Sequence, residues 1–418
     1  MSRLGGVTRR SFLSGAVAAS TASALGLAAC SGGDDDNDAA SSEATAGFVP
    51  QYYPFRGRYQ TGISSPAPAS GLMAALNVVA ADAGELRDMF VALSDETDRL
   101  MSGRPYEARA ESLPPLHTGV LGERPPATDL TIIVSVGASL FDDRFGLAAH
   151  KPADLVEMPF LANDRLDVDR SHGDVLLTVA GDTPDACIFA LRQLLRRTRK
   201  WAVLRWTIEG FNRRAQVAPG QAPVRNLLGF KDGTANLNSN DADLLDRHVW
   251  VAPGDGEPAW AAGGSYHAVR VIRMFVELWD RAALGEQQAI IGRSKETGAP
   301  LGMAAETDIP DYAADPDGAR IPLDSHIRLA NPRTAETADD LILRRGFSYS
   351  RGFDTGGRLD QGLAFASFQR RLRQFLAVQE RLNGEPLEEY IQAEGGGFFF
   401  ALPGVTTADG FLGEALFS

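Results

Sequence analysis

The sequence predicts an α+β fold made of two domains, each with a small sheet covered by helices. Its 418 residues have ordinary globular composition, with 44% hydrophobic and 23% charged residues, which is enough material for two cores. Short β-branched runs mix with helical periodicity in both halves, and a stretch rich in proline and glycine separates them. A doubly wound parallel sheet fits this order of elements less well.

In the first half we expect three strands and a helix. Residues 131–136 and 175–179 are β-branched apolar runs bounded by glycine, and 201–208 forms a further strand. Between the last two, Asp182-Thr183-Pro184 supplies a capping residue and a proline for the first helical position. The apolar spacing that follows predicts a helix over 186–196.

The second half begins after a predicted linker at 212–223, where proline and glycine interrupt any regular element. We expect a long strand at 267–278 and an amphipathic helix at 363–381. Residues 397–402 predict a buried strand closed by Pro403-Gly404.

The N-terminus has the form of a twin-arginine export signal. Arg9 and Arg10 precede an apolar pair and an uncharged run over 12–29, which is weakly apolar for a membrane span. We therefore expect a removable signal peptide at 1–29 and a protein located outside the cytoplasm.

The signal ends at Leu27-Ala28-Ala29-Cys30, which resembles the lipobox of bacterial lipoproteins. This favours a lipid anchor on Cys30, and cleavage by the ordinary signal peptidase is the alternative. An acidic flexible spacer is predicted at 30–54, followed by domains at 55–220 and 221–418.

Composition and motifs exclude several classes of function. With 54 acidic and 41 basic residues the net charge is -13, so a nucleic-acid partner is not expected. Two cysteines, Cys30 and Cys187, exclude a disulfide scaffold, a cysteine-rich metal site and thioether-attached haem. A Walker loop, a His-Glu-x-x-His motif and a Gly-x-Ser-x-Gly elbow are also missing from the sequence.

Three polar segments of the second half are candidates for chemistry. Residues 229–236 place Asp232 between glycines, which is also typical of a plain turn. Residues 324–333 contain His326 among Arg, Asn and Pro, although a lone histidine is usually a surface or satisfied core residue. Residues 343–349 contain Arg344, and paired arginines are ordinarily a solvated face.

Taken together, these segments resemble the haem-pocket motifs of the dye-decolourising peroxidases. The resemblance rests on Gly-x-x-Asp-Gly at 229–233, His-Ile-Arg-x-Ala-Asn-Pro-Arg at 326–333 and Leu-Arg-Arg-Gly-x-Ser-Tyr at 343–349. The resemblance extends over the whole chain after the signal. Within the family, the chain is similar to the exported subgroup that includes deferrochelatases. The resemblance implies two ferredoxin-like domains with antiparallel sheets and peripheral helices, the second of which binds haem.

The resemblance also implies roles for individual residues. His326 would be the iron ligand, and its other ring nitrogen would donate to a carboxylate. Glu389 is the candidate for that carboxylate, and its neighbour Glu388 is the alternative. Asp232 would move the proton of hydrogen peroxide, and Arg344 would stabilise the developing charge.

The remaining assignments concern water and the cofactor. Asn236 is expected to orient a distal water. Lys231 is expected to be a solvent-exposed side chain beside the site. The cofactor would be haem b, held without covalent attachment. Residues expected around it, besides His326 and Arg344, are Arg293, Arg333, Gly233, Thr234, Ala235, Asn331 and Pro332.

Three functions follow as hypotheses. The first is a peroxidase that reduces hydrogen peroxide and oxidises bulky one-electron donors. The second is a deferrochelatase that removes iron from haem and leaves the porphyrin intact, with iron-uptake proteins as partners. The third is a lipid-anchored binding protein with a vestigial pocket. A homo-oligomer stays open, and core packing is expected for Cys187 and for the tryptophans.

Overall fold

The structure is a computed structural model that describes residues 49–213 and 224–417. The predicted signal peptide, Cys30 and most of the predicted linker lie outside these residues. Within the described ranges no helix is both long and apolar enough to cross a membrane.

The first half has the order of elements that defines a ferredoxin-like unit. Its strands and helices follow the chain as β1 (Ser70–Val78), α1 (Ala83–Ser102), β2 (Thr131–Gly137), β3 (Val175–Gly181), α2 (Pro184–Thr198) and β4 (Ala202–Phe211). The strands pair antiparallel in the spatial order β4-β1-β3-β2. The three predicted strands and the predicted helix are confirmed.

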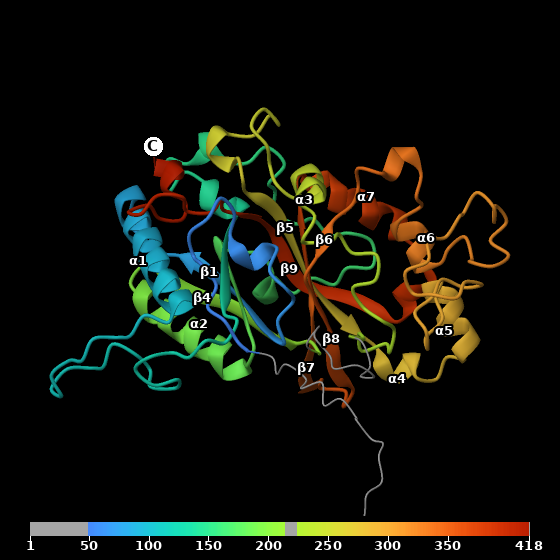
Figure 1. Cartoon of the computed structure of the whole chain (residues 1–418), viewed down its shortest axis with the longest axis horizontal. Helices are drawn as coiled ribbons and strands as arrows, with labels where there is room; N and C mark the ends of the chain where they lie inside the picture. Colours follow the sequence, from blue (N-terminus) through green and yellow to red (C-terminus); the bar gives the residue numbers. More distant parts are fainter. Residues whose placement is uncertain (1–48, 214–223, 418) are drawn as a thin grey trace, which may run out of the picture. The chain divides into compact units, whose positions relative to one another are not determined.

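Two helices cover one face of this sheet and lie side by side (Figure 1). The N-terminus of α1 is capped by Asp82, whose side chain accepts the Glu85 N–H at 2.8 Å. Helix α2 begins with Pro184 at its first position, as expected. Apolar side chains of both helices, Phe90 and Phe189 among them, pack with the sheet in a continuous core.

The predicted spacer is too long by several residues. Gln51 donates its backbone N–H to the Asp129 carboxylate at 2.8 Å, and the Tyr52 hydroxyl donates to Pro125 O at 2.9 Å. The Tyr52 ring also covers Gly103, where a Cβ would lie 2.2 Å from the ring. These contacts fix the chain to the first half before residue 55.

The second half repeats the same arrangement with a much longer first crossover. Its strands are β5 (Ser265–Met274), β6 (Leu343–Arg344), β7 (Phe347–Phe353), β8 (Leu359–Gln369) and β9 (Ile391–Ala401). Its helices are α3 (Ala242–His248), α4 (Val276–Trp279), α5 (Leu284–Ile291), α6 (His326–Ala330) and α7 (Leu372–Leu382). The main strands follow the order β9-β5-β8-β7, so both halves are ferredoxin-like with antiparallel sheets.

Two predictions for this half are partly wrong. The strand expected at 267–278 ends at Met274, and its last residues form α4. The helix expected at 363–381 is a strand up to Gln369, and only its second part is helical. The strand expected at 397–402 is confirmed, although β9 begins at Ile391.

The two sheets face each other and share an apolar layer. Side chains from β1, β3 and β4 meet those from β5, β7, β8 and β9 around Met73, Trp206, Tyr349 and Phe399. Strands β2 and β9 pair at one seam, and β4 and β7 at the other through Phe211↔Ser348. Since β5 also pairs β8, the strands close into a ring.

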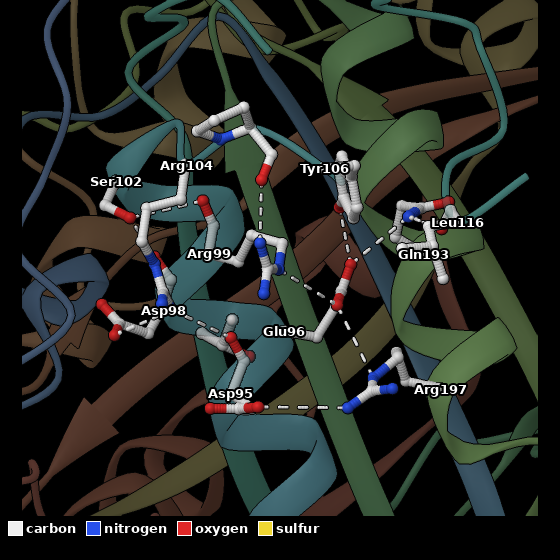
Figure 2. Close-up of polar contacts among 12 residues, drawn as sticks. Asp95, Glu96, Asp98, Arg99, Ser102, Arg104, Tyr106, Leu116, Gln193 and Arg197 are labelled. Carbon is white, nitrogen blue, oxygen red and sulfur yellow. Dashed lines mark hydrogen bonds and ion pairs between the residues drawn. The ribbon is translucent and has the colours of Figure 1, made fainter. Parts of the chain in front are cut away.

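A buried carboxylate contacts the long connection between α1 and β2. Figure 2 shows Glu96 of α1 pointing at the hydroxyl of Tyr106 and the amide of Gln193, which donate to it at 2.6 and 3.3 Å. Arg99 and Arg197 lie 4.0 and 3.7 Å from its other oxygen. The Glu96 side chain is only 4% exposed, so these donors replace water around a buried charge.

Candidate haem site

One cavity of about 320 Å3 lies on the helical side of the second sheet. Its walls come from the Asp232 loop, β5, β8, α6, α7 and the residues before β9. Predicted site residues that line it are Asp232, Gly233, Thr234, Ala235, Arg293, His326, Asn331, Arg333 and Arg344. Asn236, Pro332 and Glu389 are not among its lining residues.

His326 is the first residue of α6 and faces this cavity. Its Nδ1 lies 2.8 Å from Oε2 of Glu385, whose side chain is 3% exposed. Burial lowers the pKa of His326, but the Glu385 carboxylate outweighs burial and the net pKa is raised. Because Nδ1 is engaged, Nε2 is the nitrogen available to a ligand in the cavity.

The carboxylate partner of His326 is therefore not Glu389. Glu385 precedes a 3-10 turn, Pro386–Glu389, and the Glu389 side chain at its end is exposed. Glu388 lines the cavity, but its Oε1 accepts the N–H of Gly384 at 3.1 Å. No motif in the sequence indicated Glu385 ahead of its neighbours.

Asp232 and Arg344 line the same cavity and form a loose ion pair, with Nη1 3.8 Å from Oδ1. Oδ1 also accepts the N–H of Gly233 at 2.7 Å, whereas Oδ2 has no hydrogen-bond donor among the described residues. Arg344 donates from Nη2 to Thr234 O at 2.8 Å. The guanidinium thus reaches both the Asp232 side chain and the loop that carries it.

The Asp232 loop has an unusual backbone. Gly229 and Gly233 have φ of +84° and +83°, which glycine adopts at little cost. Ala235 also has a positive φ, of +57°, which is unfavourable for a residue with a Cβ. Such strain persists only where surrounding contacts enforce it, and it is common at functional sites.

Asn236, which was predicted to orient a distal water, contacts the backbone of Arg344. Its Nδ2 donates to Arg344 O, and its Oδ1 accepts the Arg344 N–H, both at 2.9 Å. Both ends of the amide are therefore used to hold the backbone of Arg344. Asn236 is a positioning residue for that arginine.

Two further arginines border the cavity. Arg293 is 6% exposed, and burial lowers its pKa. Arg333 has a φ of +60°, and its N–H donates to the Asn331 side chain at 3.2 Å. Beside them, the pKa of Tyr312 is raised by burial. The cavity thus combines cations, which suit carboxylates of a ligand, with apolar walls such as Phe365 and Phe375.

Lys231 is not the solvent-exposed side chain that was predicted. Its side chain is 16% exposed, and its Nζ lies 2.7 Å from Oε2 of Glu306. Glu306 was not indicated by any motif, because it sits in an excursion without a recognisable pattern.

Two family models match consecutive parts of the chain. The N-terminal model of the Dyp-type peroxidases covers residues 60–212, and the C-terminal model covers 223–406. The chain belongs to the Dyp-type peroxidase family. The resemblance seen in the sequence is thus confirmed, and the protein is a Dyp-type peroxidase by sequence and by structure.

Individual relatives agree with this membership. The chain is 50% identical to a deferrochelatase of Escherichia coli over 366 residues, which cover 87% of this chain and 86% of that one. The crystal structure of a DyP-type peroxidase from Streptomyces coelicolor matches with a TM-score of 0.79 at 33% identity, covering 88% and 97% of the two chains. The DyP-type peroxidase of Cellulomonas bogoriensis matches with a TM-score of 0.78 at 34% identity, covering 88% and 98%.

The family implies haem, and the donor set of this cavity fits it. A single imidazole backed by a carboxylate is too small a set for an iron held by protein alone, whereas a porphyrin brings its own nitrogen ligands. Within residues 49–213 and 224–417 no cluster of three His, Cys, Asp or Glu side chains is placed to hold a metal ion. Apolar walls and arginines complete a site for a flat, apolar and dianionic ligand.

Proposed function

We propose that this peroxidase uses non-covalent haem b, with His326 as the iron ligand and with Asp232 and Arg344 as the catalytic pair. One observation carries the proposal: the Nε2 of an imidazole held by buried Glu385 faces the cavity that Asp232 and Arg344 also line. When bound, haem supplies the redox chemistry that reduces hydrogen peroxide and oxidises a donor. The chain's own side chains position the reactants and move the proton.

Asp232 is suited to accept a proton from hydrogen peroxide. Its Oδ1 is held by Gly233 and faces Arg344, so Oδ2 is the oxygen open to the substrate. The same oxygen returns the proton to the departing oxygen atom as water forms. Arg344 stabilises the negative charge that develops while the O–O bond breaks.

Arg293 and Arg333 are suited to the carboxylates of the cofactor. Both line the cavity, and Arg293 is held in place because its Nη1 donates to Gly298 O at 2.6 Å. The covalent-attachment motif is missing from the sequence, so these polar contacts and His326 would retain the haem.

The test is an absorption titration of the purified protein with haem, followed by mixing with hydrogen peroxide. We expect a Soret band that His326→Ala weakens or shifts, because the iron loses its protein ligand. Asp232→Asn and Arg344→Leu should keep the band but slow the peroxide-dependent spectral change by at least about tenfold. Unchanged rates in both variants would refute the catalytic pair, and an unchanged band in His326→Ala would refute the ligand.

A second function, deferrochelation, is favoured by the 50% identity to proteins named deferrochelatase. The same cavity would bind haem as substrate and release iron with the porphyrin intact. Under anaerobic reducing conditions, extraction should recover protoporphyrin from the wild type. Recovery of haem alone would exclude this activity and leave the peroxidase unaffected.

A further inference from the structure

The loop that carries Asp232 runs between two buried apolar side chains, and polar contacts hold the residues in between. Phe230 and Leu237 are 3% and 9% exposed and anchor its ends. Between them lie the positive φ angles of Gly233 and Ala235, so the backbone there needs outside support to keep one conformation. Asp232 can act on a small substrate only if this segment is fixed.

One carboxylate outside the loop supplies that support from both sides of Asp232. Oε2 of Glu306 accepts Nζ of Lys231 at 2.7 Å, and Oε1 accepts the hydroxyl of Thr234 at 2.8 Å. Lys231 directly precedes Asp232, and Thr234 follows it by two residues. The carbonyl of Thr234 in turn accepts Nη2 of Arg344 at 2.8 Å. Glu306 is thereby connected to both members of the proposed catalytic pair.

We infer that Glu306 is a positioning residue for Asp232 and Arg344. This inference rests on the proposed function, because it gives Glu306 no role apart from that pair. Glu306 does not line the cavity and touches neither reactant. It acts by holding the Asp232 loop in the conformation that brings the carboxylate and the guanidinium together.

The surroundings of Glu306 are built for close contact. A Cβ at Gly298 would lie 2.5 Å from Cδ of Lys231 and 3.3 Å from Cγ of Glu306, so only glycine leaves room for both side chains. Arg293 Nη1 donates to the carbonyls of Gly298 and Glu306 at 2.6 and 3.1 Å. Arg293, which is proposed to hold the cofactor, therefore also holds the backbone of Glu306 and of Gly298 beside it.

The charge state of Glu306 fits this role. Burial raises the pKa of its carboxyl group, but hydrogen bonds from Lys231 and Thr234 outweigh burial, and the net pKa is lowered. The positive charges of Lys231 and Arg293 also lower this pKa. The carboxylate thus stays ionised under mildly acidic conditions, where it accepts both hydrogen bonds.

The test measures the bimolecular rate constant for the haem-loaded enzyme and hydrogen peroxide, together with haem affinity. Glu306→Ala should slow the peroxide step about tenfold, because the loop loses its contacts through Lys231 and Thr234 and Asp232 is displaced. Glu306→Gln should recover part of the rate, since its amide oxygen can still accept the Thr234 hydroxyl. Haem affinity should change by less than about twofold, because Glu306 is not a lining residue. Glu296→Ala, in the same excursion and exposed, is the matched control and should react as the wild type does.

Two further variants separate positioning from general damage. In the Asp232→Asn background, Glu306→Ala should slow the reaction by much less than tenfold, since the residue it positions is already disabled. Should Glu306→Ala not fold, Thr234→Val removes one hydroxyl only and should slow the step about threefold.

The outcomes are distinguishable. Rates within twofold of wild type in Glu306→Ala, with Asp232→Asn slow, overturn this inference and leave the proposed function intact. Full additivity with Asp232→Asn, or loss of haem in Glu306→Ala, overturns it as well. Normal rates in both Asp232→Asn and Arg344→Leu refute the proposed catalytic pair itself.

Discussion

The two halves of the molecule share a strand order but differ in what covers the sheet. In the first half, α1 and α2 fill the space over the sheet with apolar side chains. In the second half, the crossover from β5 to β6 contains only the short helices α4, α5 and α6 and long loops, and a cavity remains. The site therefore lies where the repeated fold is incompletely packed, and it does not depend on a different kind of sheet.

A buried carboxylate in each half shows the same contrast. Glu96 is enclosed by a hydroxyl, an amide and two arginines, so its charge is balanced and serves stability (Figure 2). Glu385 has the imidazole of His326 as its partner, whose other nitrogen faces the cavity. We therefore expect substitutions in the first cluster to change stability and those in the second to change chemistry.

The largest expected effect is on stability, from Glu96→Ala. It removes a buried acceptor, leaves the Tyr106 hydroxyl without a partner and leaves the Gln193 amide with the Leu116 carbonyl alone, which should lower the free energy of unfolding by about 3 kcal/mol. Denaturant unfolding measures this value. The peroxide reaction of the folded fraction should be unchanged, because no residue of this cluster lines the haem cavity.

The neighbouring residue on the same helix is the control. The Asp95 side chain is 67% exposed and lies 4.0 Å from Arg197, so Asp95→Ala should cost less than about 1 kcal/mol. Equal losses in the two variants, or a slowed peroxide reaction in Glu96→Ala, would contradict the division between the halves.

The second expected effect concerns the layer between the two sheets. His267 is fully buried, stacks on Phe368 at 4.2 Å and lies 3.1 Å from Ser135 Oγ through Nδ1. Burial lowers its pKa to about 3. An unfolded chain binds this proton near pH 6.5, so stability falls as the pH drops from about 6.5 toward 3, by up to about 1.4 kcal/mol per pH unit.

The double substitution Ser135→Ala with His267→Phe removes both the titrating ring and its hydrogen-bond partner. Unfolding free energies at pH 6.5 and 4.5 should then differ less than in the wild type, by up to about 2.7 kcal/mol. An identical pH dependence in the two proteins would show that His267 is protonated without unfolding. The measurement also tests whether the halves are joined by a dry interface.

The sequence predicted most of the first half and the outline of the site. Strands β2 and β3 are bounded by glycine, and α2 begins at a proline, so local signals were sufficient there. Strand β8 was mistaken for helix because Leu363 and Phe365 face the cavity side while Ala364 and Ala366 face the shared layer. With apolar side chains on both faces, the alternation that marks a strand disappears.

The site residues that carry motifs were found, and those that only support them were not. Asp232, His326 and Arg344 lie in recognisable segments and meet at one cavity. Glu306 and Glu385 act across the fold, at sequence separations that no local pattern encodes. From the sequence, Glu389 and Glu388 were considered but not Glu385, which lies just before the same 3-10 turn. Successive side chains of such a turn point in very different directions, so a shift of a few residues decides which carboxylate reaches His326.

The charge of Glu385 at the cavity should have a smaller effect than the two changes above. Glu385→Gln keeps the size of the side chain but removes the charge that makes His326 a stronger ligand. Haem affinity or the rate of the peroxide step should fall about tenfold, which corresponds to about 1.4 kcal/mol. Titration of the Soret band and the peroxide rate constant measure the two quantities, while thermal stability should change little.

The matched control is Glu389→Gln, which makes the same substitution at the exposed residue four positions later. It should bind haem and react with peroxide as the wild type does, because Glu389 is exposed and does not line the cavity. If Glu389→Gln were the variant impaired, the assignment of Glu385 would be wrong. If both were normal, the carboxylate would serve only to orient the ring, and the second half would differ from the first in its cavity but not in the use of its buried charge.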